Sequence, residues 1–207
     1  MEKFIKSQLL KADLIEIYRR LEGNGLKDMA SMLLVKQIFL TITNLVDFES
    51  TIRPFYKEHR ELSTEYKKAS KEYEFAKYLR NKFVGHIKSE LIEKAIVWKP
   101  ELRYLLGRTD ERDVMFVFNL FILETAINTY VNADYSHKIF ESETDLVYPP
   151  DLERFLAYLT FVVKSAIEYL TILGEVLSKK VEILDFSEIK MEYWITAGQT
   201  DFKFIKK

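Results

Sequence analysis

Apolar residues recur at steps of three and four along most of this chain, and only six glycines and four prolines interrupt them. This spacing places the apolar side chains on one face of an α-helix. Hydrophobic residues make up 48% of the 207 residues and charged residues 30%, which is typical of a folded globular protein. The sequence therefore predicts an all-α protein, an up-and-down bundle of about five helices that includes one long helix.

Glycines, prolines and polar stretches set the expected boundaries of these helices. The helices are expected over residues 3–21, 26–48, 55–98, 109–131 and 149–181. The third exceeds the usual length, so we expect a bend at Gly85 or a long hairpin arm. Residues 184–207 change character and are expected to form a small hairpin or an irregular flap, with 193–195 and 202–204 on either side of a polar turn. We interpret residues 1–183 as one helical-bundle domain and 184–207 as a C-terminal extension packed on it.

The composition argues against several classes of chemistry. The chain contains no cysteine, which removes disulfides, thiolate nucleophiles and cysteine-based zinc sites. Its three histidines, at positions 59, 86 and 137, lie far apart with no carboxylate at ligand spacing, so no metal site and no cofactor are expected. The N-terminus lacks the apolar segment of a secretory signal, and the most apolar run, 114–123, is too short to span a membrane. We therefore expect a cytoplasmic protein with no membrane partner.

Charge is distributed unevenly along a nearly neutral chain. The formal net charge is −1, so the molecule as a whole has no field that attracts nucleic acid. Residues 57–88, however, contain nine Lys or Arg against five Glu, and residues 138–154 contain two basic against five acidic residues. Any attraction for an anionic ligand is therefore expected to be local, at the segment 57–88.

One arginine interrupts the apolar stripe of the third predicted helix. The stripe consists of Leu62, Tyr66, Ala69, Tyr73, Ala76, Phe83 and Ile87, and Arg80 occupies the position between Ala76 and Phe83. A buried guanidinium costs several kcal/mol unless it is paired, so Arg80 is expected to have an anionic partner or ligand. On an ideal helix, His86 lies about 120° around and about 9 Å along the axis from Arg80. A permanent cation beside a group that titrates near neutral pH suits phosphate chemistry.

The segment from Tyr78 to His86, with the sequence YLRNKFVGH, resembles the signature of the HEPN superfamily. In that signature an Arg, followed by a polar residue, precedes a His by four to six positions, and Asn81 stands at the polar position. Members of the superfamily are four- or five-helix bundles, and many are metal-independent ribonucleases of toxin or phage-defence systems. The resemblance covers about the middle half of the chain. A second pair with the same spacing, Arg53 and His59, contains Pro54 and spans a predicted helix break, so we interpret it as accidental.

The resemblance implies an endoribonuclease that cleaves RNA by attack of its own 2′-hydroxyl, without a metal. It implies that His86 acts as general acid or base, that Arg80 stabilises the charge on the phosphorus oxygens, and that Asn81 orients one of these groups. The family usually builds its site across a two-fold axis, so a homodimer is expected. RNA and a nucleotidyltransferase or antitoxin are the implied partners. The alternative interpretation is a non-catalytic helical interaction module or dimeric scaffold that binds a protein partner or a nucleotide.

Overall fold

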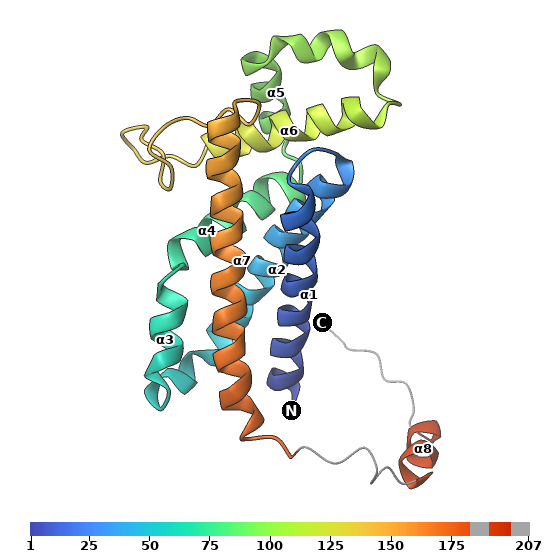
Figure 1. The fold of residues 1–207 in the computed structure, drawn as a ribbon, viewed down its shortest axis with the longest axis vertical. Coiled ribbons are helices and arrows are strands. Elements are labelled where there is room, and N and C mark those ends of the chain that lie inside the picture. The colour runs from blue at the N-terminus through green and yellow to red at the C-terminus, as the bar shows by residue number, and fades with distance from the viewer. Residues whose placement is uncertain (183–190, 200–207) are drawn as a thin grey trace.

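A computed structural model describes residues 1–182 and 191–199 of the chain, and residues 1–182 form an all-α helical bundle (Figure 1). Four of the expected helices are confirmed within a few residues: α1 (Glu2–Asn24), α2 (Met29–Ile52), α6 (Arg112–Asn128) and α7 (Pro149–Ser178). Within the described ranges, β-pairing is limited to one isolated bridge between Val131 and His137. The prediction of an all-α bundle is therefore confirmed.

The ends of these helices follow from local sequence. Gly25 ends α1 with a φ of 63°, a left-handed conformation that glycine adopts without steric cost. Asp28 then caps α2, because its side chain accepts the N–H of Ser31 at 2.8 Å while the Ser31 hydroxyl accepts the N–H of Asp28 at 3.0 Å. This capping box moves the start of α2 from the expected Leu26 to Met29. At the start of α7, Pro149 supplies a fixed φ where no N–H is needed.

The prediction of one long helix over residues 55–98 was wrong. Residues 53–108 instead form a series of shorter pieces: η1 (Arg53–Lys57), α3 (Arg60–Lys67), α4 (Ser70–Leu79), the π-helical turn η2 (Arg80–Val84), α5 (Ser89–Trp98) and η3 (Pro100–Arg108). A straight helix over 55–98 would be roughly 66 Å long, whereas the 30-residue α7 spans only about 45 Å. The breaks fold the segment back over the core, and the expected bend at Gly85 is one of them.

The apolar stripe of this segment nevertheless remains buried across the breaks. Leu62, Ala69, Tyr73, Ala76 and Phe83 all belong to the main core cluster, although Ile87 at the end of the stripe is exposed. Each short piece therefore turns its stripe toward the same core, against α2 and α7. The spacing predicted which residues are buried, although it did not predict where the helix breaks.

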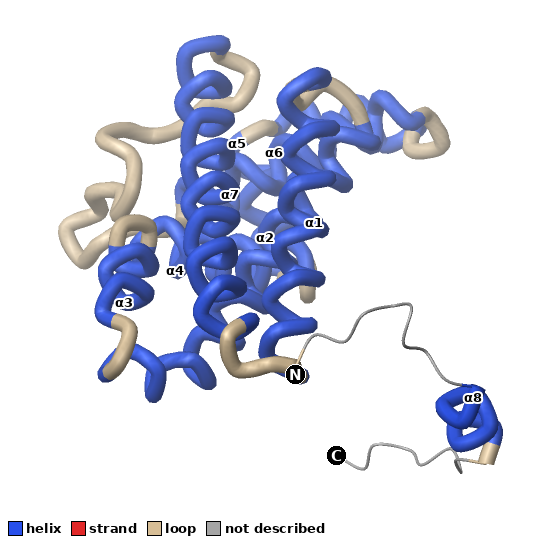
Figure 2. Tube along the Cα trace, turned by 60° about the horizontal axis from the view of Figure 1, so that its bottom comes forward, coloured by secondary structure: helices blue, strands red, loops and turns tan. Residues whose placement is uncertain are grey.

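The core is organised around α2, which packs against α1, α4, α6 and α7. In both views α1 and α7 lie side by side (Figures 1 and 2). Two helical stretches, Met29–Lys57 and Pro149–Ser178, are long and apolar enough to cross a membrane, with 56% and 50% of their most apolar windows buried inside the protein. Core helices of soluble proteins have the same length and composition, so these two stretches are weak evidence for a membrane.

The prediction of a C-terminal hairpin was also wrong for its first half, which is the half that the structure describes. Residues Met191–Gly198 form a short helix, α8, so the strand expected at 193–195 is helical. Met191, Trp194 and Ile195 have the three-and-four spacing of a helix rather than the alternation of a strand. The other expected strand, 202–204, lies outside the described residues. All residues of α8 are exposed, and the packing of the extension on the bundle stays a prediction.

Candidate functional site

The candidate site is the π-helical turn η2, which follows α4 directly. The N–H of Gly85 donates to the carbonyl of Arg80 at 2.7 Å, five residues back rather than four. Single π-helical turns of this kind are frequent at functional sites. Phe83, which is only 1% exposed, anchors the turn in the core against α2 and α6. The backbone of the turn is thus held by packing, while residues 86–88 beyond it are exposed and non-helical.

Arg80 is half-buried and has no carboxylate partner among the described residues. Its Nε is buried without any hydrogen-bond acceptor, and its Nη1 donates to Oδ1 of the neighbouring Asn81 at 3.1 Å. Arg154 is also half-buried and its Nε likewise has no acceptor, but its Nη2 forms an ion pair with Asp151 at 3.0 Å. An unsatisfied guanidinium donor away from water is costly, because the donor has lost its hydration without gaining a partner. Among the described residues, the guanidinium of Arg80 therefore has no carboxylate to balance its charge.

The Arg80 guanidinium lies directly against Gly85. A Cβ atom added to Gly85 would lie 3.2 Å from Nη1 and 3.3 Å from Cζ of Arg80, which is tighter than an ordinary contact. Only glycine therefore leaves full room for the guanidinium in this position. Since His86 is the next residue, the guanidinium packs on the backbone immediately before the imidazole.

His86 and Asn81 are both exposed. His86 makes no hydrogen bond or ion pair with any residue that the structure describes, so its imidazole is open to a ligand. The structure thus brings Arg80, Asn81 and Gly85 into contact and places His86 beside them in the chain. It does not hold His86 against Arg80 by any hydrogen bond.

The second Arg–His pair differs in this respect. Arg53 forms an ion pair with the buried Glu49 at 3.0 Å, and His59 Nδ1 lies 3.1 Å from an oxygen of Glu61. Both side chains therefore have carboxylates of the chain as partners, whereas Arg80 and His86 have none among residues 1–182 and 191–199.

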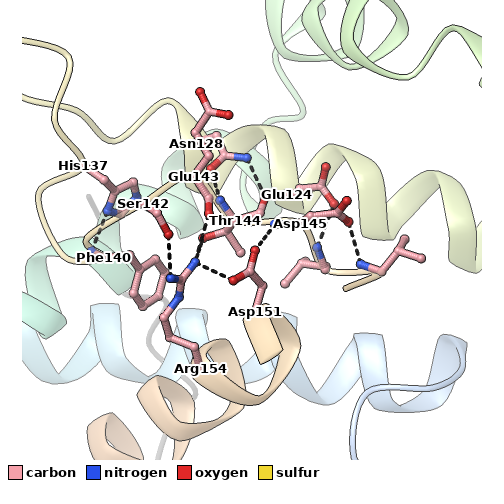
Figure 3. Close-up of polar contacts among 12 residues, drawn as sticks. Glu124, Asn128, His137, Phe140, Ser142, Glu143, Thr144, Asp145, Asp151 and Arg154 are labelled. Carbon is pink, nitrogen blue, oxygen red and sulfur yellow. Dashed lines mark hydrogen bonds and ion pairs between the residues drawn. The ribbon is translucent and has the colours of Figure 1, made fainter. Parts of the chain in front are cut away.

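A polar network that sequence reasoning missed holds the long loop between α6 and α7 (Figure 3). Glu124 of α6 is 5% exposed; one of its oxygens lies 3.1 Å from Lys99 Nζ, and the other accepts the N–H of Leu146 at 2.9 Å. The amide of Asn128 both donates to and accepts from the backbone of Thr144, each at 2.8 Å. The network borders an open cleft of about 870 Å³. Its carboxylate is already paired, so we interpret the network as structural.

His137 belongs to the same loop, and both of its ring nitrogens form hydrogen bonds with the backbone. Its Nδ1 accepts the N–H groups of Ile139 at 3.0 Å and Phe140 at 2.8 Å, which requires Nε2 to carry the proton that it donates to the Ile127 carbonyl at 2.9 Å. Burial lowers the pKa of His137, which keeps the imidazole neutral. His137 thus holds the loop and is not available for chemistry.

The side chains that could ligate a metal ion are dispersed over the described residues. In the part of the chain that the structure describes, no group of three or more His, Cys, Asp or Glu side chains is placed to hold a metal ion. The motif of Arg80, Asn81 and His86 is thus the candidate site that the sequence indicates.

The chain matches no family model, no curated protein and no solved structure. Its own residues and their geometry are therefore the basis for a proposed function.

Proposed function

We propose that this protein is a HEPN-like, metal-independent endoribonuclease of the toxin or phage-defence type. The observation that carries the proposal is the state of Arg80: a half-buried guanidinium without a carboxylate partner, packed on Gly85 and one residue away from an exposed imidazole. An RNA phosphodiester supplies the anion that this guanidinium lacks. Cleavage of that phosphodiester requires proton transfers, which an imidazole can catalyse.

In the proposed reaction, the 2′-oxygen of RNA attacks the adjacent phosphorus and the bond to the 5′-oxygen breaks. A base removes the proton of the 2′-hydroxyl, and an acid gives a proton to the leaving 5′-oxygen. The products are a 2′,3′-cyclic phosphate and a 5′-hydroxyl. His86 performs one of these transfers, and in a homodimer the His86 of a second copy performs the other.

Arg80 stabilises the negative charge that develops on the phosphorus oxygens. The terminal N–H groups of its guanidinium that are not bonded to Asn81 can form charge-assisted hydrogen bonds to these oxygens, whereas Nε is buried. Asn81 accepts from Nη1 and so fixes the direction of the guanidinium, which makes it a positioning residue. The proposal includes a homodimer in the cytoplasm, RNA as substrate, and a nucleotidyltransferase or antitoxin as a further partner.

The proposal is tested by incubating the purified protein with single-stranded RNA in the presence of excess EDTA. We expect cleavage to continue at an unchanged rate and to leave 2′,3′-cyclic phosphate ends, which are detected by mass spectrometry of the fragments. Loss of cleavage in EDTA that Mg²⁺ restores would contradict the mechanism. Binding of RNA without any cleavage would favour the alternative, a non-catalytic interaction module.

Replacing Gly85 with Ala is expected to lower the rate of RNA cleavage on the order of tenfold without unfolding the protein. The backbone of Gly85 has φ −75° and ψ −41°, which alanine adopts readily, so the new methyl group acts mainly by pushing the Arg80 guanidinium away. Single-turnover cleavage and thermal unfolding measure the two effects. Gly107→Ala is the matched control, because nothing lies within 4 Å of its added Cβ. An unchanged rate for Gly85→Ala would show that the position of the guanidinium is unimportant.

A further inference from the structure

A second cation without a carboxylate partner lies next to the π-helical turn. Lys36 of α2 is half-buried, and its Nζ lies 4.7 Å from the centre of the Phe83 ring. The same Nζ donates to Oδ1 of Asn119, on α6, at 2.6 Å. Three elements far apart in the sequence thus meet at this ammonium group.

The ammonium group of Lys36 has hydrogen-bonding capacity to spare. It has three N–H donors, and Asn119 accepts one of them. No carboxylate among the described residues forms an ion pair with it, and burial lowers its pKa. Lys99, also half-buried, instead lies 3.1 Å from an oxygen of Glu124. Lys36 is therefore a partly desolvated cation that has a neutral acceptor and an aromatic ring as partners but no carboxylate.

Asn119 is fixed so that its oxygen faces Lys36. Its Nδ2 donates to the carbonyl of Met115 at 2.7 Å and lies 3.8 Å from the sulfur of Met29. The amide oxygen is therefore held toward Lys36 Nζ, which in turn holds the ammonium over the ring of Phe83. This arrangement orients the cation in advance of any ligand, as a preformed binding group requires.

The two unpaired cations belong to one neighbourhood. Phe83, which lies under Lys36, is the fourth residue of the turn that begins with Arg80. The turn also packs against α2, the helix that carries Lys36. Two cations without carboxylates, one on each of two packed elements, favour a ligand that carries more than one negative charge. A polynucleotide backbone has this property, with one phosphate per nucleotide.

We propose that Lys36, oriented by Asn119 and Phe83, forms a second phosphate subsite that binds a phosphodiester of the RNA neighbouring the one at Arg80. The identity of the ligand rests on the proposed function. A compact ammonium with free donors binds phosphate as a point charge, so the subsite contributes affinity and register along the strand rather than base specificity.

The test measures binding of a short single-stranded RNA to His86→Ala protein, in which binding is separated from cleavage, across a range of salt concentrations. Adding Lys36→Met to this background is expected to weaken binding roughly tenfold at low salt. It should also reduce the slope of log affinity against log salt by about 0.7, the value for one phosphate contact on a single strand. Lys36→Arg should keep most of the slope. The thermal midpoint of Lys36→Met is expected to stay unchanged or rise, because Met removes an unpaired and partly buried charge.

The matched control is Lys94→Met. Lys94 also lies over an aromatic ring, that of Trp98 at 5.9 Å, but it borders the cleft near Glu124 instead of the turn. Its replacement is expected to leave the salt slope unchanged. A lower thermal midpoint for Lys36→Met with unchanged affinity and slope would overturn the subsite and make Lys36 a structural cation. The absence of RNA binding by the His86→Ala background would also overturn it. If the wild-type protein binds RNA without cleaving it, the proposed function fails while the slope measurement still decides the role of Lys36.

Discussion

Replacing His86 with Ala is expected to lower the rate of RNA cleavage by about 10²- to 10⁴-fold, the usual contribution of a general acid or base. The folded state should be unaffected, because His86 is exposed and makes no hydrogen bond or ion pair with the described residues. Surface substitutions of this kind usually change the free energy of unfolding by less than about 0.5 kcal/mol. Single-turnover cleavage and urea-induced unfolding measure the two quantities on the same preparation.

His59→Ala is the matched control for this experiment. His59 stands in the second Arg–His pair, and its imidazole is 3.1 Å from Glu61, so its removal should leave the cleavage rate unchanged. Cleavage by His86→Ala at the wild-type rate would rule out the catalytic proposal. If His86→Ala instead lost dimerisation while the wild-type protein showed no turnover, the result would favour an interaction module.

Replacing Arg80 with Ala is expected to reduce cleavage by about 10²- to 10³-fold, as is typical when one donor to the charged transition state is removed. Arg80→Lys should recover only part of this loss, because lysine keeps the charge but not the planar fork of donors. Stability is expected to stay the same or increase, since the substitution removes an unpaired and partly buried charge. Measuring kcat/KM and the free energy of unfolding separates the two effects.

Arg53→Ala should give the opposite pattern. Arg53 pairs with Glu49, whose side chain is buried, so removing Arg53 leaves that carboxylate with the hydroxyl of Tyr56 as its remaining partner. We expect a loss of stability with the cleavage rate of the folded protein unchanged. If Arg80→Ala also lost several kcal/mol of stability while retaining activity, Arg80 would be a structural residue and the proposed site would be wrong.

The fold was predictable wherever local signals determine it. The spacing of apolar residues, the stop at Gly25 and the start at Pro149 indicated α1, α2, α6 and α7. The breaks near His59 and Ala69 were not predictable, because neither position has a proline or glycine nearby that would end a helix there. Their φ values of −128° and −124° depart from helical geometry as the segment folds back over the core. Tertiary packing outweighs the local preference for one continuous helix.

The candidate site was predictable in part. The position of Arg80 within an apolar stripe indicated a partly buried cation, but its close approach to Gly85 was not predicted. The pairing of Lys36 with Asn119 was not predictable, because 83 residues separate them and the chain path between them depends on the breaks described above. The contacts of Glu124 were not predictable either, because its partners Lys99 and Leu146 lie outside its own helix.

The π-helical turn ends α4 with one residue more than an α-helical turn would need. Its hydrogen bond from Gly85 to Arg80 closes a loop that is one residue larger than an α-helical turn. Deleting one residue between Arg80 and Gly85 would remove the residue that the wider turn accommodates, and would change the position of the imidazole relative to the guanidinium. The number of residues between the two side chains is therefore as much a property of the site as their identities.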